Sequence, residues 1–256
     1  MIDIHTHLLP GVDDGSPSVE VSLPVLQHFR DGGVETVVCT PHLDASRASE
    51  APYEQHCEIL ETLRAAAPQK PKLELGWEIM LDQPGVDLRD KRFSLGGSSA
   101  ILVEFPRSAL PPNASAELFR LRMSGVVPVV AHPERYWGCT VAIVEEWRRV
   151  GAVMQMDAIG MLGGDSTSRL SMELLEAGMV DMLASDTHGD RRSLVAARQW
   201  LHEFGADEHA ELLTATNARK LLANEPLIPV SPLPRRAGML GRLKELVLGR
   251  RSRSSY

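Results

Sequence analysis

Apolar runs of β-like length recur along the first 185 residues, and segments with helical spacing separate most of them. Seven runs are mostly continuously apolar, which is typical of parallel strands that are buried on both faces. These runs are residues 1–5, 35–40, 72–78, 100–105, 126–132, 152–157 and 180–185, and the helical segments are residues 24–31, 53–66, 115–123, 141–150 and 169–177. The alternation predicts an α/β fold, either a barrel or a doubly wound sheet.

Glycine residues mark the ends of four helical segments. Gly32 and Gly33 follow the first segment, and Gly125, Gly151 and Gly178 follow three of the others. Because glycine adopts the left-handed conformation without a steric penalty, it commonly ends a helix. We therefore expect left-handed backbone at these positions.

His, Asp and Glu side chains stand at or soon after the ends of six of the seven runs. The nine residues are His5, His7, Asp14, His42, Glu78, Glu104, His132, Asp186 and His188. Barrel enzymes hold their active sites at the C-terminal strand ends, around the ring, whereas a doubly wound sheet concentrates ligands at one switch point. The distribution therefore favours a barrel with about seven strands. Imidazole and carboxylate groups bind zinc, manganese or iron without thiolates, so we predict a metal centre.

The composition narrows the class of protein. A chain of 256 residues is long enough for one α/β barrel domain. Its net charge of −7 argues against a nucleic-acid partner, which would attract an excess of Lys and Arg. No apolar run reaches the roughly 20 residues of a membrane-spanning helix, so we expect a cytoplasmic protein. The three cysteines predict reduced thiols, and none is followed by the arginine that a cysteine-dependent phosphatase requires.

Seven short motifs carry the candidate ligands. Met-Ile-Asp-Ile-His-Thr-His opens the chain, and Val-Asp-Asp-Gly, Thr-Pro-His, Gly-Trp-Glu, Val-Glu-Phe, Ala-His-Pro-Glu-Arg-Tyr and Ala-Ser-Asp-Thr-His follow in that order. The ordered set resembles the polymerase-and-histidinol-phosphatase (PHP) superfamily, and more closely its bacterial protein-tyrosine phosphatases encoded with capsular and exopolysaccharide machinery. The resemblance covers roughly residues 1–225. It implies a PHP-type metal-dependent phosphatase domain with the PHP fold, a distorted (β/α)7 barrel.

The resemblance also implies how the ligands divide among three divalent metal ions. His5, His7 and Asp186 would hold the first ion, and Glu78 would bridge it to the second. The remaining ligands would be Glu104 and His132 for the second ion, and Asp14, His42 and His188 for the third. The Asp-Asp-Gly spacing favours Asp14 over its neighbour Asp13. The resemblance favours Mn²⁺, with iron or zinc as alternatives.

Arginine residues near two of the motifs are candidate catalytic residues that bind phosphate. Arg135 follows His132 closely and is expected to bind a phosphate group bidentately, unless it pairs with Glu134 instead. Either Arg191 or Arg192 would supply a second clamp, and the sequence does not choose between them.

Other histidines and tryptophans have plainer expected roles. His28, His56, His202 and His209 lie on helices and are expected to be solvated or capping residues. The four tryptophans, including Trp77 and Trp137 beside ligand motifs, are expected to be packing or rim residues.

These expectations together predict a metal-dependent protein-tyrosine phosphatase. Its substrate would be a phosphotyrosine protein, namely the tail of a bacterial tyrosine kinase that controls capsule or exopolysaccharide synthesis. A small-molecule phosphomonoesterase such as histidinol phosphatase is the alternative enzyme. A nuclease is disfavoured because no broad basic groove is visible. A non-catalytic kinase-binding regulator would require lost ligands, and none is missing.

Residues 226–256 differ in composition from the preceding domain. Four prolines between residues 226 and 234 predict a linker, and the following Arg-rich segment has Leu240, Leu243, Leu246 and Val247 at roughly helical spacing. This segment predicts either a short basic amphipathic helix or a mobile basic tail. As a helix it would make peripheral contact with anionic lipid at the inner membrane face, or with an acidic partner.

Overall fold

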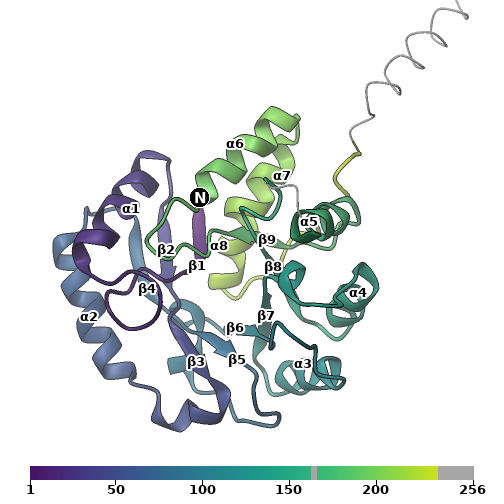
Figure 1. Ribbon diagram of the computed structural model, residues 1–256, viewed down its shortest axis with the longest axis horizontal. Helices are drawn as coiled ribbons and strands as arrows, with labels where there is room; N and C mark the ends of the chain where they lie inside the picture. Colours follow the sequence, from purple (N-terminus) through teal and green to yellow (C-terminus); the bar gives the residue numbers. More distant parts are fainter. Residues whose placement is uncertain (163–165, 236–256) are drawn as a thin grey trace, which may run out of the picture.

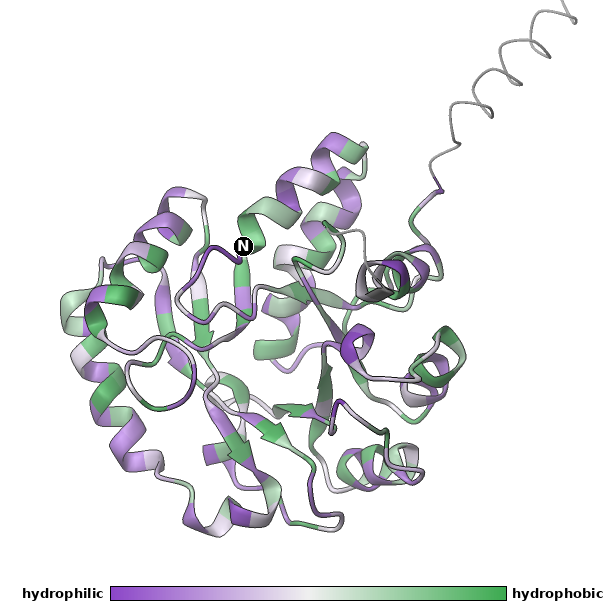
Figure 2. Ribbon diagram, in the orientation of Figure 1, coloured by the Kyte–Doolittle hydropathy of each residue, from purple (hydrophilic) through white to green (hydrophobic). Residues whose placement is uncertain are grey.

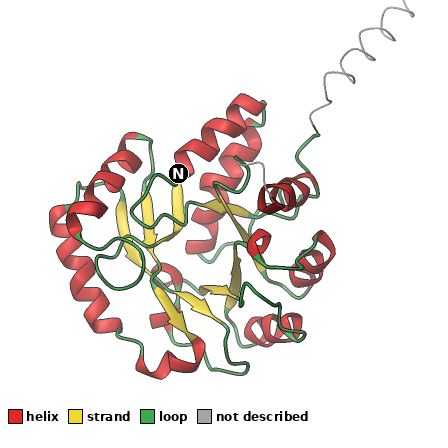
Figure 3. Cartoon of the chain, viewed as in Figure 1, coloured by secondary structure: helices red, strands yellow, loops and turns green. Residues whose placement is uncertain are grey.

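The computed structural model describes residues 1–162 and 166–235, in which strands and helices alternate along the chain (Figure 1, Figure 3). The strands are β1 (Ile2–Thr6), β2 (Thr36–Cys39), β3 (His42–Asp44), β4 (Lys72–Leu75), β5 (Glu78–Met80), β6 (Ala100–Glu104), β7 (Val127–Ala131), β8 (Val153–Asp157) and β9 (Met182–Ala184). Each recorded pairing between them is parallel. The α/β class predicted from the sequence is therefore confirmed.

The strands form two hydrogen-bonded sheets, ordered β1-β2-β4 and β3-β5-β6-β7-β8-β9. Short contacts connect the sheets at both sides. The Glu78 backbone N–H donates to the Pro41 carbonyl at 3.1 Å, where β2 leads into β3 and β4 leads into β5. On the other side, Thr6 forms a parallel bridge with Thr187, which follows β9. The seven-stranded barrel stays a prediction at this point.

The prediction that residues 72–78 form one strand is wrong. The run breaks between β4 and β5 at Gly76, where a Cβ atom would lie only 2.8 Å from the Leu95 side chain. The sequence analysis also missed β3. Its buried Leu43 lies between exposed His42 and Asp44, so it has no continuous apolar run to reveal it.

Helices surround the strands in Figure 1. They are α1 (Val19–Asp31), α2 (Tyr53–Ala66), α3 (Ala114–Met123), α4 (Val141–Arg149), α5 (Ser166–Glu176), α6 (Leu194–Phe204), α7 (Asp207–Glu211) and α8 (Asn217–Leu222), with 3-10 turns η1 (Ala45–Glu50), η2 (Lys91–Phe93), η3 (Leu95–Gly97) and η4 (Pro133–Arg135) and a π turn η5 (Leu212–Thr216). The predicted bounds of α2 are confirmed. Helix α1 begins before the expected start and runs through Pro24, and α6 to α8 were not predicted.

Four of the predicted helix-ending glycines have left-handed backbone. The φ angles are 83° at Gly33, 93° at Gly125, 93° at Gly151 and 66° at Gly178. The prediction is wrong for Gly32, whose φ of −80° is right-handed. One left-handed residue is sufficient to end each helix.

Apolar side chains form two buried clusters, and the strands carry much of the hydrophobic colour in Figure 2. The larger cluster joins strand residues to the helices, with Phe105 and Trp147 in ring contact at 5.4 Å. The smaller cluster consists mostly of strand residues, including Ile4 and Leu102, with contributions from α8. The strands that end at the candidate ligands are therefore fixed by packing on their apolar side chains.

Residues 226–235 pack against the domain, although they form neither helix nor strand. Leu233 is 2% exposed, and its backbone N–H donates to the Leu175 carbonyl at 2.9 Å. Arg235 pairs with Glu176 on α5 at 2.9 Å. The predicted domain boundary at residue 225 stays a prediction, and the predicted basic helix falls in 236–256, outside the described residues. None of the described helices has the length and apolar character needed to span a membrane.

Replacing Ile4 with Ala should test the smaller cluster. Ile4 is fully buried in β1, so its truncation should lower the free energy of unfolding by about 2–5 kcal/mol. Met123, at the end of α3, is 69% exposed and serves as the control, with an expected change below about 0.5 kcal/mol for Met123→Ala. Urea denaturation followed by circular dichroism measures both values. Equal stability losses in the two variants would contradict this packing.

Candidate metal centre

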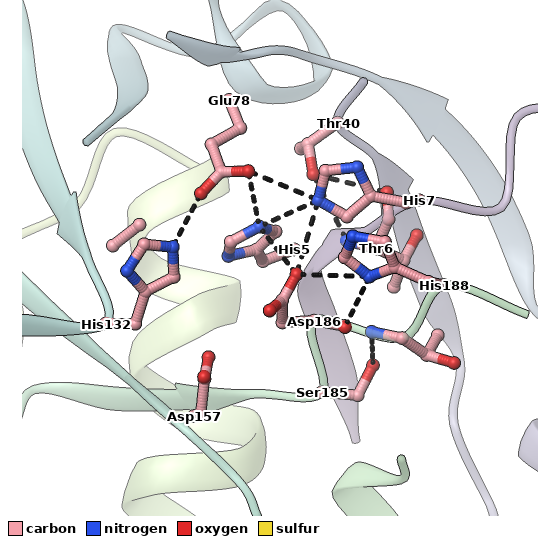
Figure 4. A network of polar contacts seen from close by, with 12 residues as sticks. His5, Thr6, His7, Thr40, Glu78, His132, Asp157, Ser185, Asp186 and His188 are labelled. Carbon is pink, nitrogen blue, oxygen red and sulfur yellow. Dashed lines mark hydrogen bonds and ion pairs between the residues drawn. The ribbon is translucent and has the colours of Figure 1, made fainter. Parts of the chain in front are cut away.

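The nine candidate ligands lie together. His42 and Glu78 are the first residues of β3 and β5, and the other ligands lie near the C-terminal ends of strands or in the segments that follow them. His5 lies in β1 and Glu104 ends β6, while His132 and Asp186 follow β7 and β9. Figure 4 shows six of the nine, and their side chains point toward a common centre. His42 joins this centre through Nδ1, which lies 3.1 Å from Glu78 Oε2, and Asp14 Oδ1 lies 3.2 Å from His42 Nε2. The structure thus brings together the residues that the sequence singled out.

Three overlapping groups have ligand atoms within 4.8 Å of one another. The groups are His5, His7, Glu78 and Asp186; His7, Asp14, His42 and His188; and His42, Glu78 and Glu104. The first two groups contain the sets that the resemblance assigns to the first and third ions. The remaining predicted ligand, His132, contacts Glu78 Oε1 through Nε2 at 2.7 Å.

Hydrogen bonds from Nδ1 fix the orientation of three imidazole rings. His7 Nδ1 lies 2.7 Å from Asp13 Oδ2, and His5 Nδ1 lies 2.9 Å from Gln155 Oε1. His188 Nδ1 lies 3.0 Å from the Asp186 carbonyl oxygen. With Nδ1 protonated and donating, each ring presents the lone pair of Nε2, as metal-bound histidines do.

The donor atoms converge so closely that a cation fits between them. His5 Nε2 and His7 Nε2 are 3.2 Å apart. Both nitrogens lie 3.2–3.3 Å from Glu78 Oε2 and from Asp186 Oδ1. In addition, Glu104 Oε2 and His132 Nδ1 are buried without a hydrogen-bond partner among the described residues. Two nitrogens and two carboxylate oxygens facing one point form a suitable donor set for a divalent cation.

Without a cation, the carboxylates favour protonation of the buried histidines. Burial alone would lower the pKa of His5, but Glu78 and Asp186 raise it to about 9. Burial also opposes charging of His7, yet hydrogen bonds from its ring to Asp13, Asp186 and Glu78 raise its pKa to about 12. The same histidines hold the pKa of the Asp186 carboxyl well below its usual range, against the effect of burial. Metal binding must therefore displace protons from this cluster.

The centre is open on one side. The side chains of His5, His7 and His132 are fully buried, whereas those of His42 and Asp14 are 36% and 72% exposed. A substrate can therefore reach the centre past His42 and Asp14.

Two of the three candidate arginines contact the centre through Asp186. Arg135 Nη1 donates to Asp186 Oδ2 at 2.6 Å, and Arg192 Nη1 donates to the same oxygen at 3.1 Å. Arg191 is exposed and forms no hydrogen bond or ion pair with a described residue. The alternative pairing of Arg135 with Glu134 is wrong, because Arg135 pairs with Asp157 instead, while a Glu134 oxygen accepts from the Asp157 backbone N–H.

Sequence reasoning missed three residues that hold the ligands and arginines in place. Asp13 contacts His7, Gln155 contacts His5, and Asp157 contacts Arg135. Gln155 is a buried polar residue within an apolar strand. A polar residue in such a run indicates a buried hydrogen bond, so the sequence could have pointed to it. Asp13 was visible only as the neighbour of Asp14.

Two of the four histidines expected to be solvated or capping residues are buried. The His56 ring lies 4.7 Å from the Trp77 ring, measured between centroids. His209 Nε2 lies 2.9 Å from the Ser231 carbonyl oxygen. Both residues therefore have structural contacts that their helical positions did not reveal. Of the two tryptophans, Trp77 is buried and Trp137 is 79% exposed.

Two candidate ligands have left-handed backbone, with φ of 34° at His132 and 48° at Asp186. This conformation is uncommon outside glycine and costs roughly 1–3 kcal/mol. The surrounding strands and hydrogen bonds must hold it. Strained residues of this kind gather at functional sites.

Known proteins resemble this chain over most of its length. A family model described as capsular polysaccharide synthesis, CpsB/CapC, matches residues 1–223. The chain is similar to tyrosine-protein phosphatase YwqE of Bacillus subtilis (strain 168), with 28% identity covering 91% of this chain and 96% of YwqE. It is similar to tyrosine-protein phosphatase CpsB of Streptococcus pneumoniae, with 27% identity covering 88% of this chain and 99% of CpsB.

A solved structure of a related protein has a similar fold. It comes from work on YwqE of Bacillus subtilis and CpsB of Streptococcus pneumoniae, which are described as unique metal-dependent tyrosine phosphatases. The TM-score is 0.76 with 28% identity, and the match covers 92% of this chain and 100% of the solved one.

Binding of Mn²⁺ should strengthen as the pH rises from about 6 to about 9. The raised pKa of His5 keeps a proton on the metal-free site throughout this range, so affinity should rise about tenfold per pH unit for each proton released. Competition with a chelator measures the affinity. The half-exposed His202 provides a control, since His202→Ala should keep this dependence whereas His5→Ala should bind Mn²⁺ weakly at every pH. A pH-independent affinity in the unmodified protein would contradict the prediction.

Proposed function

The chain belongs to the CpsB/CapC family of capsular polysaccharide synthesis proteins, and from this membership we propose that it is a metal-dependent tyrosine phosphatase. It hydrolyses phosphotyrosine to tyrosine and inorganic phosphate. The observation that carries the proposal is the convergence of His5, His7, Glu78 and Asp186 on one point, on a protein whose relatives are named tyrosine-protein phosphatases.

Three divalent ions, with Mn²⁺ preferred over iron or zinc, are the proposed cofactors. Bound divalent ions would acidify water, bind phosphate oxygens and offset the negative charge that develops at phosphorus. The three groups of neighbouring ligand atoms, together with His132, support this number. The nine residues predicted from the sequence are the proposed ligands.

Arg135 and Arg192 are the proposed phosphate-binding residues. Both guanidinium groups donate to Asp186, and both are about one-fifth exposed, so they lie at the edge of the centre. Asp157 and Asp190 hold the two guanidinium groups from their other sides. Their planar donor groups suit the oxygen atoms of a phosphate. Because a phenolate is a better leaving group than an alkoxide, the reaction on phosphotyrosine needs less help from a general acid.

We also propose that the two sheets close as a distorted seven-stranded barrel. In this reading β2 and β3 together occupy one position of the ring, and β4 and β5 together occupy another. The hydrogen bond from Glu78 to Pro41 and the bridge between Thr6 and Thr187 support it. A ring of strand ends explains how ligands from distant motifs meet at one centre.

The proposed substrate is the tyrosine-rich tail of a bacterial kinase that controls capsule or exopolysaccharide synthesis. Family membership supports a role in this synthesis. The exposed Asp14 and His42 at the open side support access by a flexible protein segment. Action on such a tail places the proposed function in the cytoplasm.

Substrate preference should separate this proposal from the alternatives. With Mn²⁺ bound, the protein should release phosphate faster from a phosphotyrosine peptide than from a phosphoserine peptide or histidinol phosphate. His42→Ala should lower this release by roughly 100-fold, because it removes a candidate ligand. A preference for histidinol phosphate would move the protein to the small-molecule enzymes, and metal binding without any release would favour a non-catalytic regulator.

Matched Arg-to-Lys variants should distinguish an arginine that binds phosphate, Arg135, from one that makes no contact with the centre, Arg191. Lysine keeps the charge but loses the planar pair of donors, so Arg135→Lys should lower kcat/KM for the phosphotyrosine peptide by roughly 10- to 100-fold. Arg191→Lys should change it by less than about twofold, since Arg191 makes no contact with the centre. Steady-state kinetics at equal metal content give both values. Equal losses in the two variants would contradict the assignment.

A further inference from the structure

A small pocket adjoins the metal centre on its open side. It shares His42 with the centre, and we call it the His42 pocket. Its apolar and aromatic lining consists of Val12, Leu43, Pro52, His56 and Trp77, and its other lining residues, Asp44, Arg47 and Glu50, are exposed. An apolar interior with exposed charged residues at its edge is typical of a site that takes up an apolar group from a soluble ligand.

Two aromatic rings in tilted contact form one wall of the His42 pocket. The ring centroids of His56 and Trp77 are 4.7 Å apart, with 30° between the ring planes. Trp77 is fixed further by its Nε1–H, which donates to the Arg92 carbonyl at 2.8 Å. His56 is buried, and its Nδ1 has no hydrogen-bond partner in the described part of the chain. These contacts hold both rings in place, so the aromatic wall of the pocket is rigid.

The volume of the pocket matches one aromatic ring. It is about 220 Å³, whereas a cavity of roughly 150 Å³ is sufficient for benzene. We propose that the His42 pocket holds the tyrosyl ring of the substrate while the phosphate lies at the metal centre. This inference rests on the proposed phosphatase function and makes the pocket the source of tyrosine selectivity.

The position of His42 supports this arrangement. His42 Nδ1 lies 3.1 Å from Glu78 Oε2 in the centre, while the same ring lines the pocket. A ring in the pocket is therefore one residue away from the phosphate site. A phosphoserine side chain has no ring and leaves the pocket unfilled, so it gains none of the stabilisation that comes from burying apolar area.

A second pocket, lined in part by the proposed phosphate-binding Arg192, is less suited to a single ring. It is lined by Val21, Pro24, His28, Gly189, Arg191 and Arg192, among others, and we call it the Arg192 pocket. Its volume of about 650 Å³ is much larger than one ring requires. It also contains none of the nine candidate ligands. The His42 pocket is the better match in size, and of the two pockets it is the one that shares a candidate metal ligand.

Two phosphonates test the inference without turnover. Methylphosphonate reports the phosphate site alone, while phenylphosphonate adds the ring. Calorimetry with the Mn²⁺-loaded full chain should give roughly tenfold or greater preference for phenylphosphonate. Val12→Phe, which fills the His42 pocket, should reduce the preference to about one without changing methylphosphonate binding. Val21→Phe, the matched substitution in the Arg192 pocket, should keep the preference.

The opposite pattern, with the preference lost only in Val21→Phe, would place the ring in the Arg192 pocket and overturn the inference. The inference also fails if the unmodified protein shows no preference. Should Val12→Phe weaken methylphosphonate binding as well, a crystal structure of the unmodified protein with phenylphosphonate decides the matter. A ring between Pro52 and Trp77 supports the inference, and a ring elsewhere overturns it.

The same experiments distinguish this inference from the proposed function. Release of phosphate from the phosphotyrosine peptide without a phenylphosphonate preference leaves the phosphatase function intact and removes the pocket assignment. A phenylphosphonate preference without release from any phosphopeptide supports the ring site and contradicts the phosphatase function.

Discussion

The rest of the site depends on four side chains that meet at one point. His5 Nε2 and His7 Nε2 lie 3.2 Å apart and face the Glu78 and Asp186 carboxylates. Burying so many ionisable groups is costly unless protons or cations balance their charges. The fold holds them there through the packed strands and through hydrogen bonds such as that between His7 and Asp13. The rigid scaffold therefore holds these charged side chains close together, although without it they would move apart into solvent.

Asp186 connects the metal site to the proposed phosphate-binding arginines. One of its oxygens faces the two buried histidines, and the other accepts from Arg135 and Arg192. Under the proposed assignment, metal binding and phosphate binding would therefore be coupled through one carboxylate, because a change in its position would move both sets of partners. Asp157, which holds Arg135 on the far side, limits that movement.

The sequence predicted the parts of the site that depend on strand ends. Continuous apolar runs located most strands, and residues that follow them, such as His132 and Asp186, met as expected because parallel strands end on the same side. The three-residue strand β3 was missed because only Leu43 in it is buried. Arg191 and Arg192 are adjacent in the sequence and follow the same motif, so the sequence cannot distinguish them. Only the tertiary contacts of Arg192 do so. Likewise, the role of Asp157 depends on a long-range pair with Arg135 that no local pattern encodes.

The left-handed backbone at His132 and Asp186 restricts which residues these two positions accept over evolutionary time. A β-branched residue would be strained there whatever its chemistry, while Gly, Asn, Asp and His fit the backbone more readily. Few residue types are therefore tolerated at these two positions, and several of them can coordinate a cation. The backbone at these two positions therefore favours a small set of residues that includes the candidate ligands His and Asp.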